Sequence, residues 1–376
     1  MELRKILADR IRAAREKLGL TQSQLAEMSG FASSQIISQI EKAERDIKAW
    51  ELFNLAKALR TDVANLLAEN EPRPVAQVLW RKTPTQNKQL LEADFVQRCE
   101  EYALVEKLCD IRYDNGLPII KTDLSSMKLP DAEKIGKQIR VELNLGNRPA
   151  SCLADILENK FGVKIWYRNL GEEGSAASSK GTFGYGVLIN ATEAPWRRNY
   201  SFAHELFHLL TWDSVTPDDF TRGEAPNQIE KLADVFASNL LLPDDEINEV
   251  LKNRVRENKI EYADLVELAR EFGVSTIALL WRLKNLGYIN GDMVQKLEND
   301  PEFKQLDRNI RDGAWTTPPS IPERFVRLAF MAYQNGRLSR SKLAGLVNKS
   351  LLDLSDFLLE YGLDDTQDYK TPVYIS

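Results

Sequence analysis

The sequence predicts a mainly α-helical protein with a small α+β domain in the middle of the chain and an all-α domain at the N-terminus. Apolar residues recur at helical spacing along most of the 376 residues. Near the N-terminus, two short helical stretches are joined by a glycine-containing turn. In the middle, two strand-like runs lie between amphipathic helical stretches. A chain of this length is typical of about two to three domains.

Charge and cysteine usage narrow the class of protein. The formal net charge of −6 excludes a wholly basic nucleic-acid binder. Residues 1–70 carry eleven Lys and Arg against ten Asp and Glu, so any nucleic-acid contact is expected on one face of that segment. Cys99, Cys109 and Cys152 form no C-x-x-C pair, which is typical of a reducing cytosol. No stretch reads as a signal peptide or a membrane span, so we expect a cytoplasmic protein with no membrane contact.

Residues 1–70 are predicted to form an all-α domain of five helices. Gly19 ends the first helix, and Thr21 caps the second with Gln24 three residues later, which is a capping box. The other three helices are expected over about Ser33–Glu41, Trp50–Leu59 and Val63–Leu67. A polar helix that follows a short helix and a glycine turn is typical of a helix-turn-helix.

This segment resembles the XRE/Cro family of DNA-binding domains. The matching runs are R-x-x-R-E-K-L-G-L-T-Q-S-Q-L-A-E-M-S-G, I-x-x-I-E-K-A-E-R and L-A-K-A-L, and the likeness covers nearly all of residues 4–68. The interval from Gly30 to Glu41 is one residue longer than the family pattern. The resemblance implies that Gln22 contacts a phosphate of double-stranded DNA. It also implies that base edges are read by the exposed residues Ser33, Ser34, Gln35, Ser38 and Gln39.

The same face offers few cations for phosphate contacts, mainly Lys42, Arg45 and Lys48. Because phosphate contacts supply most DNA affinity, a single copy should bind weakly. We therefore expect a homodimer on paired half-sites about one DNA turn apart. The alternative interpretation is that residues 1–70 mediate protein docking or dimerisation rather than DNA binding.

Residues 71–129 are expected to be a linker and connecting helices, and residues 130–290 a second domain. Prolines punctuate residues 70–85, which favours a linker. A helix with apolar residues from Leu91 to Cys109 should follow. The second domain is predicted to contain helices over Ala132–Leu143 and Ala150–Phe161, strands over Val163–Tyr167 and Tyr185–Asn190, and a mobile Gly/Ser/Ala-rich loop over Gly171–Gly181.

A helical stretch after the second strand contains the motif H-E-x-x-H. His204 and His208, the two histidines of the chain, lie four residues apart, so they share one face of a helix. Two imidazoles in this arrangement can hold one zinc ion, and the intervening Glu205 can act as a general base on water. The alternative is an amphipathic core helix that carries two hydrogen-bonded histidines.

A catalytic zinc takes three protein ligands, so a third ligand is expected after the motif. The nearby acids are Asp213, Asp218, Asp219, Glu224 and Glu230. We select Glu230, which opens a predicted buried helix. Asp234 lies one turn later and is expected to accept a hydrogen bond from a liganding imidazole. Glu230 can also be a first-turn acid that simply favours the helix dipole.

The runs A-H-E-L-F-H-L-L and E-K-L-A-D-V-F-A-S-N-L-L-L-P together resemble the ImmA/IrrE family of zinc metallopeptidases, over roughly residues 130–290. The resemblance implies a zincin-like α+β metallopeptidase fold and a Zn²⁺ cofactor. It also implies a site-specific endopeptidase whose substrate is a transcriptional repressor. The rival interpretation is a DNA-binding regulator or antitoxin whose peptidase fold serves as a sensor or scaffold. An intact Glu205 favours chemistry, because a scaffold needs no base.

Two further features of the reaction are expected from the sequence. A tetrahedral oxyanion needs a donor, and Arg197, Arg198 and Tyr200 are the candidates because they precede the motif; each is equally consistent with ordinary surface packing. The strand over Tyr185–Asn190 is expected to bind an extended substrate by edge pairing.

The rest of the chain is predicted to be mostly helical. Ile260–Phe272 and Ile277–Leu286 form a helix pair that either packs on the second domain or reads DNA. Residues 291–376 are expected to form a C-terminal helical lobe that begins with a polar linker over 291–320. The sequence assigns this lobe no chemistry.

Overall fold

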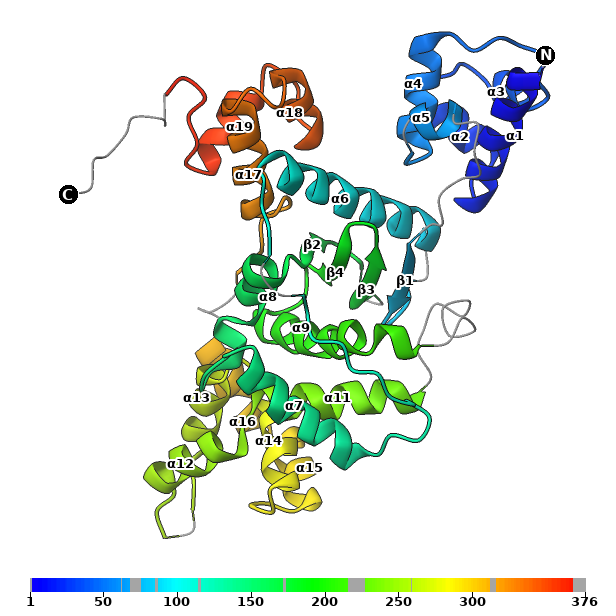
Figure 1. Ribbon diagram of the computed structural model, residues 1–376. Helices are drawn as coiled ribbons and strands as arrows, with labels where there is room; N and C mark the ends of the chain where they lie inside the picture. The colour runs from blue at the N-terminus through cyan, green and yellow to red at the C-terminus, as the bar shows by residue number, and fades with distance from the viewer. Residues whose placement is uncertain are drawn as a thin grey trace. The chain divides into compact units, whose positions relative to one another are not determined.

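The computed structural model describes residues 2–61, 63–67, 76–84, 87–113, 116–171, 174–215, 227–257, 259–311 and 316–367 (Figure 1). The chain divides into two compact units. The N-terminal unit comprises Met1–Ala76 and Pro84–Glu100, and the C-terminal unit comprises Gln77–Thr83 and Glu101–Ser376. The segment Gln77–Thr83 is thus flanked in the chain, on both sides, by residues of the N-terminal unit.

The N-terminal unit confirms the predicted helices. They are α1 (Glu2–Lys17), α2 (Gln22–Met28), α3 (Ser34–Glu41), α4 (Ala49–Ala58) and α5 (Val63–Leu67). The capping box at α2 is present, since Thr21 Oγ1 accepts from the Gln24 backbone N–H at 3.2 Å and Gln24 Oε1 accepts from the Thr21 N–H at 2.8 Å. Ile11, Leu25, Ile37 and Leu55 fill the core, and Leu90 and Ala93 pack against it.

The C-terminal unit is built on a sheet with the strand order β1-β3-β4-β2. The strands are β1 (Gln77–Trp80), β2 (Lys164–Arg168), β3 (Ala176–Gly181) and β4 (Gly184–Asn190). β3 pairs antiparallel with β1 and β4, with Trp80 opposite Ala177 and Ser178 opposite Val187. β4 pairs parallel with β2, with Trp166 opposite Leu188.

Two predictions for this region are wrong. The expected linker over 70–85 contains strand β1, whose Leu79 and Trp80 are buried. The expected loop Gly171–Gly181 contains β3, one of the two inner strands of the sheet. Its run A-A-S-S-K-G has low strand propensity, but Ala176, Ala177, Ser178 and Ser179 are completely buried. Their small side chains let a helix approach the sheet closely, so tertiary packing overrides local propensity here.

The two faces of the sheet are covered by different helices. Tyr167 on β2 packs edge-on against Phe202 of α9, with ring centroids 6.1 Å apart. The next residue back, Trp166, points to the opposite face, as strand alternation requires. It contacts Tyr102 of α6 (6.1 Å) and Phe325 of α17 (5.2 Å). Figure 1 shows α9 and the C-terminal half of α6 on opposite sides of the sheet.

Helices make up the rest of the C-terminal unit. They are α6 (Lys88–Leu108, begun in the N-terminal unit), α7 (Leu129–Glu142), η1 (Pro149–Ser151), α8 (Leu153–Phe161), α9 (Pro195–Leu210), η2 (Trp212–Ser214), α11 (Asn227–Leu241), α12 (Asp244–Arg254), α13 (Tyr262–Glu271), α14 (Thr276–Asn285), α15 (Gly291–Asn299), α16 (Pro301–Arg311), α17 (Glu323–Gln334), α18 (Arg340–Leu346) and α19 (Leu354–Glu360).

The predicted helices before and after the motif are therefore present, and α13 and α14 bury Leu268 and Leu280 in the core of this unit. The predicted linker over 291–320 is wrong for α15 and α16, and positions 312–315 of that stretch lie outside the described residues. None of the helices in the described ranges has the length and apolar character needed to cross a bilayer.

Candidate metal centre

Helix α9 carries the H-E-x-x-H motif through the most buried part of the C-terminal unit. Pro195 occupies its first turn, where a missing N–H costs nothing. His204 and Glu205 have no exposed surface, and His208 is 1% exposed. The motif therefore lies inside the core, between the sheet and α11, rather than on an open face.

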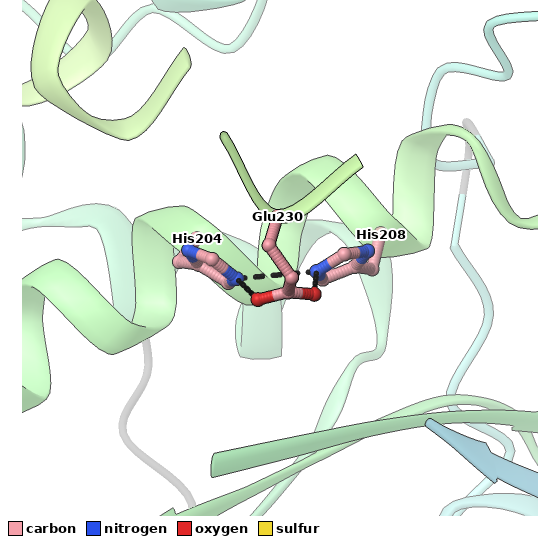
Figure 2. A group of neighbouring side chains, drawn as sticks. All are labelled: His204, His208 and Glu230. Atoms are coloured by element: carbon pink, nitrogen blue, oxygen red, sulfur yellow. Dashed lines mark hydrogen bonds and ion pairs between the residues drawn. The ribbon is translucent and has the colours of Figure 1, made fainter. Parts of the chain in front are cut away.

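Three donor groups converge on one point (Figure 2). The Nε2 atoms of His204 and His208 are 3.2 Å apart. Glu230, from α11, places one carboxylate oxygen 3.0 Å from Nε2 of His204 and the other 3.2 Å from Nε2 of His208. Within the described residues this is the cluster whose ligand atoms lie close enough to hold a metal ion, all within 4.8 Å of one another.

The other acids that the sequence offers as a third metal ligand are not found beside the two histidines in the described structure. Asp213 lies in η2, and its carboxylate accepts a hydrogen bond from Lys180 Nζ at 2.6 Å. Asp218, Asp219 and Glu224 lie outside the described residues. Glu230 is thus the acid that the described structure brings to both histidines.

Asp234 lies one helical turn beyond Glu230 and contacts the far side of His204. Its Oδ1 is 2.9 Å from His204 Nδ1. A neutral imidazole that donates from Nδ1 keeps its Nε2 lone pair for a ligand. The structure thus places Asp234 where an outer hydrogen-bond partner of a liganding histidine is expected.

Glu205 points to the sheet and is hydrogen-bonded by Ser178 of β3, whose hydroxyl donates to Oε2. Its other oxygen, Oε1, is buried and has no hydrogen-bond partner among the described residues. Burial raises the pKa of Glu205, because the charged carboxylate is removed from water. Ser178 was not singled out from the sequence, since it lies in the run read as a loop.

The two carboxylates of the site are tuned in opposite directions. Burial alone disfavours ionised Glu230, but hydrogen bonds from His204 and His208 hold its pKa at about 2. Burial likewise disfavours charged His204, yet its hydrogen bonds to Asp234 and Glu230 raise its pKa. The cluster therefore favours an ionised Glu230 carboxylate, which is the form in which a carboxylate binds a metal cation.

The three residues predicted to stabilise the oxyanion differ in their partners and in their exposure. Arg198 is a structural residue, because Nη1 donates to the backbone carbonyl of Glu193 (2.9 Å) and Nη2 to that of Thr316 (2.6 Å). The prediction that it serves the oxyanion is wrong, since its donors are already used by loops. Tyr200 donates its hydroxyl to the Asp234 backbone carbonyl at 2.9 Å, and Arg197 is exposed on α9.

A cation that sequence reasoning missed lies beside the site. Arg81, immediately after β1, donates from Nη1 to Ser201 Oγ at 3.2 Å and has Nη2 3.4 Å from Asp234 Oδ1. No local signal marks it, because it falls in the stretch read as a linker. Recognising β1 as a strand of this sheet would have been required to place it.

In the N-terminal unit, two of the expected DNA-contacting residues have internal partners. Gln22 Nε2 donates to the buried carboxylate of Glu41 at 2.8 Å. Arg45 forms an ion pair with buried Glu51 at 2.7 Å. Among the others, Ser33, Gln35, Lys42 and Lys48 are exposed, whereas Ser34, Ser38 and Gln39 are partly exposed.

Known protein families match both the N-terminal helical segment and the segment that contains the metal cluster. Residues 158–284 match the family described as Peptidase_M78, IrrE N-terminal-like domain, and residues 11–66 match a helix-turn-helix family. The chain thus carries an IrrE-like Peptidase_M78 domain. Its N-terminus carries a helix-turn-helix DNA-binding domain, which confirms the XRE-type likeness.

Individual relatives match only part of this chain. The control protein C.SmaI of Serratia marcescens is 43% identical over 67 residues, which is 18% of this chain and 79% of that protein. A Mycobacterium tuberculosis transcriptional regulator of known structure is 18% identical with a TM-score of 0.30, over 49% of this chain and 51% of the regulator. The chain thus spans about half the length of that regulator.

Proposed function

We propose that this IrrE-like protein is a zinc-dependent, site-specific endopeptidase that cleaves a transcriptional repressor and carries its own DNA-binding domain. The observation that supports the proposal most is the convergence of His204, His208 and Glu230 with Glu205 on the adjacent position of α9. Double-stranded DNA and a repressor as partners would place the activity in the cytoplasm.

The residues at this point fit a zinc ion. Two imidazole nitrogens and a carboxylate are a donor set that zinc prefers in catalytic sites, and three protein donors leave one position open. The hydrogen bond from His204 Nδ1 to Asp234 directs the Nε2 lone pair toward the cluster. When bound by His204, His208 and Glu230, zinc would supply Lewis-acid activation of water and of the scissile carbonyl.

Glu205 has the properties of a general base. Its raised pKa makes its carboxylate a better proton acceptor than an exposed glutamate, and Oε1 is free of hydrogen-bond partners among the described residues. Ser178 holds the other oxygen and so fixes the direction in which Oε1 points. Glu205 would take a proton from the attacking water and deliver it to the leaving amine.

The substrate cannot pair with β4, as expected from the sequence, because β4 lies between β3 and β2. That prediction is wrong. Strand β1 is an edge of the sheet, and it leads directly to Arg81 beside Asp234. We therefore assign extended binding of the substrate to the β1 edge, where main-chain hydrogen bonds would align it with the cluster.

The test is incubation of the purified protein with the repressor encoded by the neighbouring gene, with and without a zinc chelator, read by intact mass. Cleavage at one peptide bond that the chelator abolishes is expected. Glu205→Gln should keep both zinc and fold but lower the rate by about a hundredfold or more, because it removes the base and retains the hydrogen bond with Ser178. Cleavage by Glu205→Gln at the wild-type rate would contradict the assigned role.

One observation favours the second candidate, a DNA-binding regulator or antitoxin whose peptidase fold is a sensor or scaffold. His204, Glu205 and His208 are almost completely buried, so in this conformation a polypeptide does not reach them. A sensor needs only the metal, whereas an endopeptidase must also expose Glu205. Metal-dependent DNA binding without cleavage of the repressor, and with Glu205→Gln indistinguishable from wild type, would favour this candidate.

A further inference from the structure

Arg81 connects three elements around the metal cluster. Its backbone N–H extends the sheet by donating to the Ala176 carbonyl at 3.1 Å. Its guanidinium then leaves the sheet edge and contacts α9 through Ser201 and α11 through Asp234. Arg81 is therefore the point at which the end of β1, the motif helix and the helix of Glu230 meet.

The Asp234 carboxylate that Arg81 contacts is half-exposed, whereas the His204 imidazole on the other side of Asp234 is buried. The Asp234 side chain is 50% exposed, and the His204 side chain that it contacts has no exposed surface. A half-exposed carboxylate loses little by rotating into water, so one hydrogen bond to an imidazole restrains it weakly. Tyr200 adds a restraint on the backbone of Asp234, and the Arg81 guanidinium lies 5.6 Å from the centre of the Tyr200 ring.

We propose that Arg81 is a positioning residue that fixes the Asp234 carboxylate against Nδ1 of His204 and thereby orients His204 as a metal ligand. The inference rests on the proposed metal site but not on peptidase activity. It assigns to the segment between the two parts of the N-terminal unit a direct part in building the metal centre.

The direction in which zinc affinity changes when Arg81 is replaced distinguishes a positioning role from a purely electrostatic one. A positive guanidinium near a metal cation repels it, so if charge alone mattered, removing Arg81 would tighten zinc binding. If Arg81 acts by holding Asp234, removing it frees the carboxylate, and zinc binding weakens. The two roles therefore predict opposite changes in the same dissociation constant.

The experiment measures zinc affinity of the full chain by competition with a chromogenic chelator, and the visible spectrum of the Co²⁺-substituted protein. The variants are Arg81→Gln, Arg81→Lys, Asp234→Asn and the double variant Arg81→Gln/Asp234→Asn. Lys82→Gln is the matched control, because Lys82 is the exposed neighbour of Arg81. Thermal unfolding of each metal-free variant reports whether the fold is retained.

Arg81→Gln is expected to weaken zinc binding about three- to tenfold, and Asp234→Asn about ten- to a hundredfold. Arg81→Lys should recover part of the loss, and Lys82→Gln should match wild type. In the Asp234→Asn background, Arg81→Gln should have no further effect, because its route to His204 is already lost. The Co²⁺ spectrum should change in Arg81→Gln and stay unchanged in Lys82→Gln.

Unchanged or tighter zinc binding in Arg81→Gln overturns the proposal, as does a full additional loss in the double variant. If Arg81→Gln does not fold, Arg81→Lys decides, since equal affinity and an unchanged Co²⁺ spectrum would then count against positioning. Failure of the wild type to bind zinc would instead refute the proposed function. The two failures are therefore distinguishable.

Discussion

At the scale of single residues, hydrogen bonds from neighbouring elements hold the side chains of the candidate site in place. Each functional side chain has a partner from another element: Glu205 has Ser178 from β3, and His204 has Asp234 from α11. The motif predicts the functional residues of α9 from spacing alone, because four residues bring two side chains to one face of a helix. Their partners come from elsewhere in the sequence, and no local pattern announces Ser178 or Arg81.

Glu230 is the residue whose assignment most needs a direct test. Glu230→Ala is expected to weaken zinc binding by at least about a hundredfold, because it removes one of three ligands. Asp213→Ala is the matched control, since Asp213 is paired with Lys180 and should leave affinity unchanged. Elemental analysis after dialysis against a chelator checks both variants. Wild-type zinc retention by Glu230→Ala would move the third ligand to the segment that holds Asp218, Asp219 and Glu224.

At the scale of elements, the position of Glu230 depends on how closely α11 packs against α7. Gly136 of α7 faces the α11 backbone, and a Cβ at this position would lie 2.8 Å from the Phe236 carbonyl oxygen and 3.2 Å from Asn239 Cβ. Only a residue without a side chain fits this contact. The sequence predicted both helices, but it could not predict which of its glycines marks a helix crossing.

Gly136→Ala is therefore expected to lower the free energy of unfolding by about 1–3 kcal/mol, because α7 and α11 must separate. The separation should also weaken zinc binding, since α11 carries Glu230. Gly345→Ala is the control: Gly345 is a helical glycine of α18 with nothing within 4 Å of an added Cβ. That change should be neutral or stabilise by up to about 1 kcal/mol. Equal effects of the two substitutions in chemical denaturation would contradict the packing argument.

The predicted DNA contacts lie on α2, on α3 and in the segments that flank α3, and they differ in whether the side chain already has a partner within the protein. Gln22 and Arg45 are engaged with Glu41 and Glu51, whereas Gln35 and Lys48 are exposed. Gln35→Ala should relax sequence preference at one base pair by about 1–3 kcal/mol, and Lys48→Ala should weaken binding to all sequences and reduce the salt slope by about one. Salt-titrated binding to duplex DNA checks both.

The DNA prediction has a separate control in the chain itself. A protein that lacks residues 1–70 keeps β1 and should lose duplex binding, because the helix-turn-helix is removed. Equal affinity of the shortened and the full protein would assign this domain to protein docking instead.

At the scale of the whole C-terminal unit, the last helices are joined to the sheet through a buried polar network. Glu106 of α6 forms ion pairs with Lys164 of β2 (2.7 Å) and Arg324 of α17 (2.8 Å). Tyr102 donates to Glu158 of α8 at 2.8 Å. Removal of one member of such a network is strongly destabilising, because it leaves a buried charge without its partner. The expected C-terminal lobe is therefore attached by α17 to the sheet that carries the site.

Glu158 makes this network sensitive to pH. Burial raises its pKa from the ordinary 4.5 to about 7, against the opposing effects of Tyr102 and Arg324. Because the folded state binds the proton more tightly, stability should fall as pH rises from about 4.5 to about 7. Glu158→Gln should therefore stabilise the protein by about 1–3 kcal/mol at pH 8 and have little effect at pH 4.

Denaturation at the two pH values checks this prediction. Glu142→Gln, an exposed change on α7, is the matched control for a simple loss of charge. A gain of similar size in Glu142→Gln, or a gain for Glu158→Gln that does not depend on pH, would contradict it.

The sequence predicted the parts of this molecule whose structure follows from local periodicity. The helix-turn-helix, the motif helix and strands β2 and β4 are of this kind. It failed where a segment takes its structure from its neighbours. Strand β3 is polar and small in sequence, and β1 is short and surrounded by prolines, so both depend on pairing that only the folded sheet provides.

The interleaving of the two units has a consequence for any protease that meets this protein. A cut between residues 67 and 77 separates the five-helix segment from the rest of the chain. The downstream fragment nevertheless keeps Leu90 and Ala93, which pack on the core of that segment. The severed domain would stay associated after hydrolysis, so a nick there is better detected under denaturing conditions than by size in native buffer. A cut after Thr83 would leave β1 and Arg81 on the upstream fragment. The sheet would then be formed by strands from two separate polypeptides, because β1 pairs with β3 of the downstream fragment.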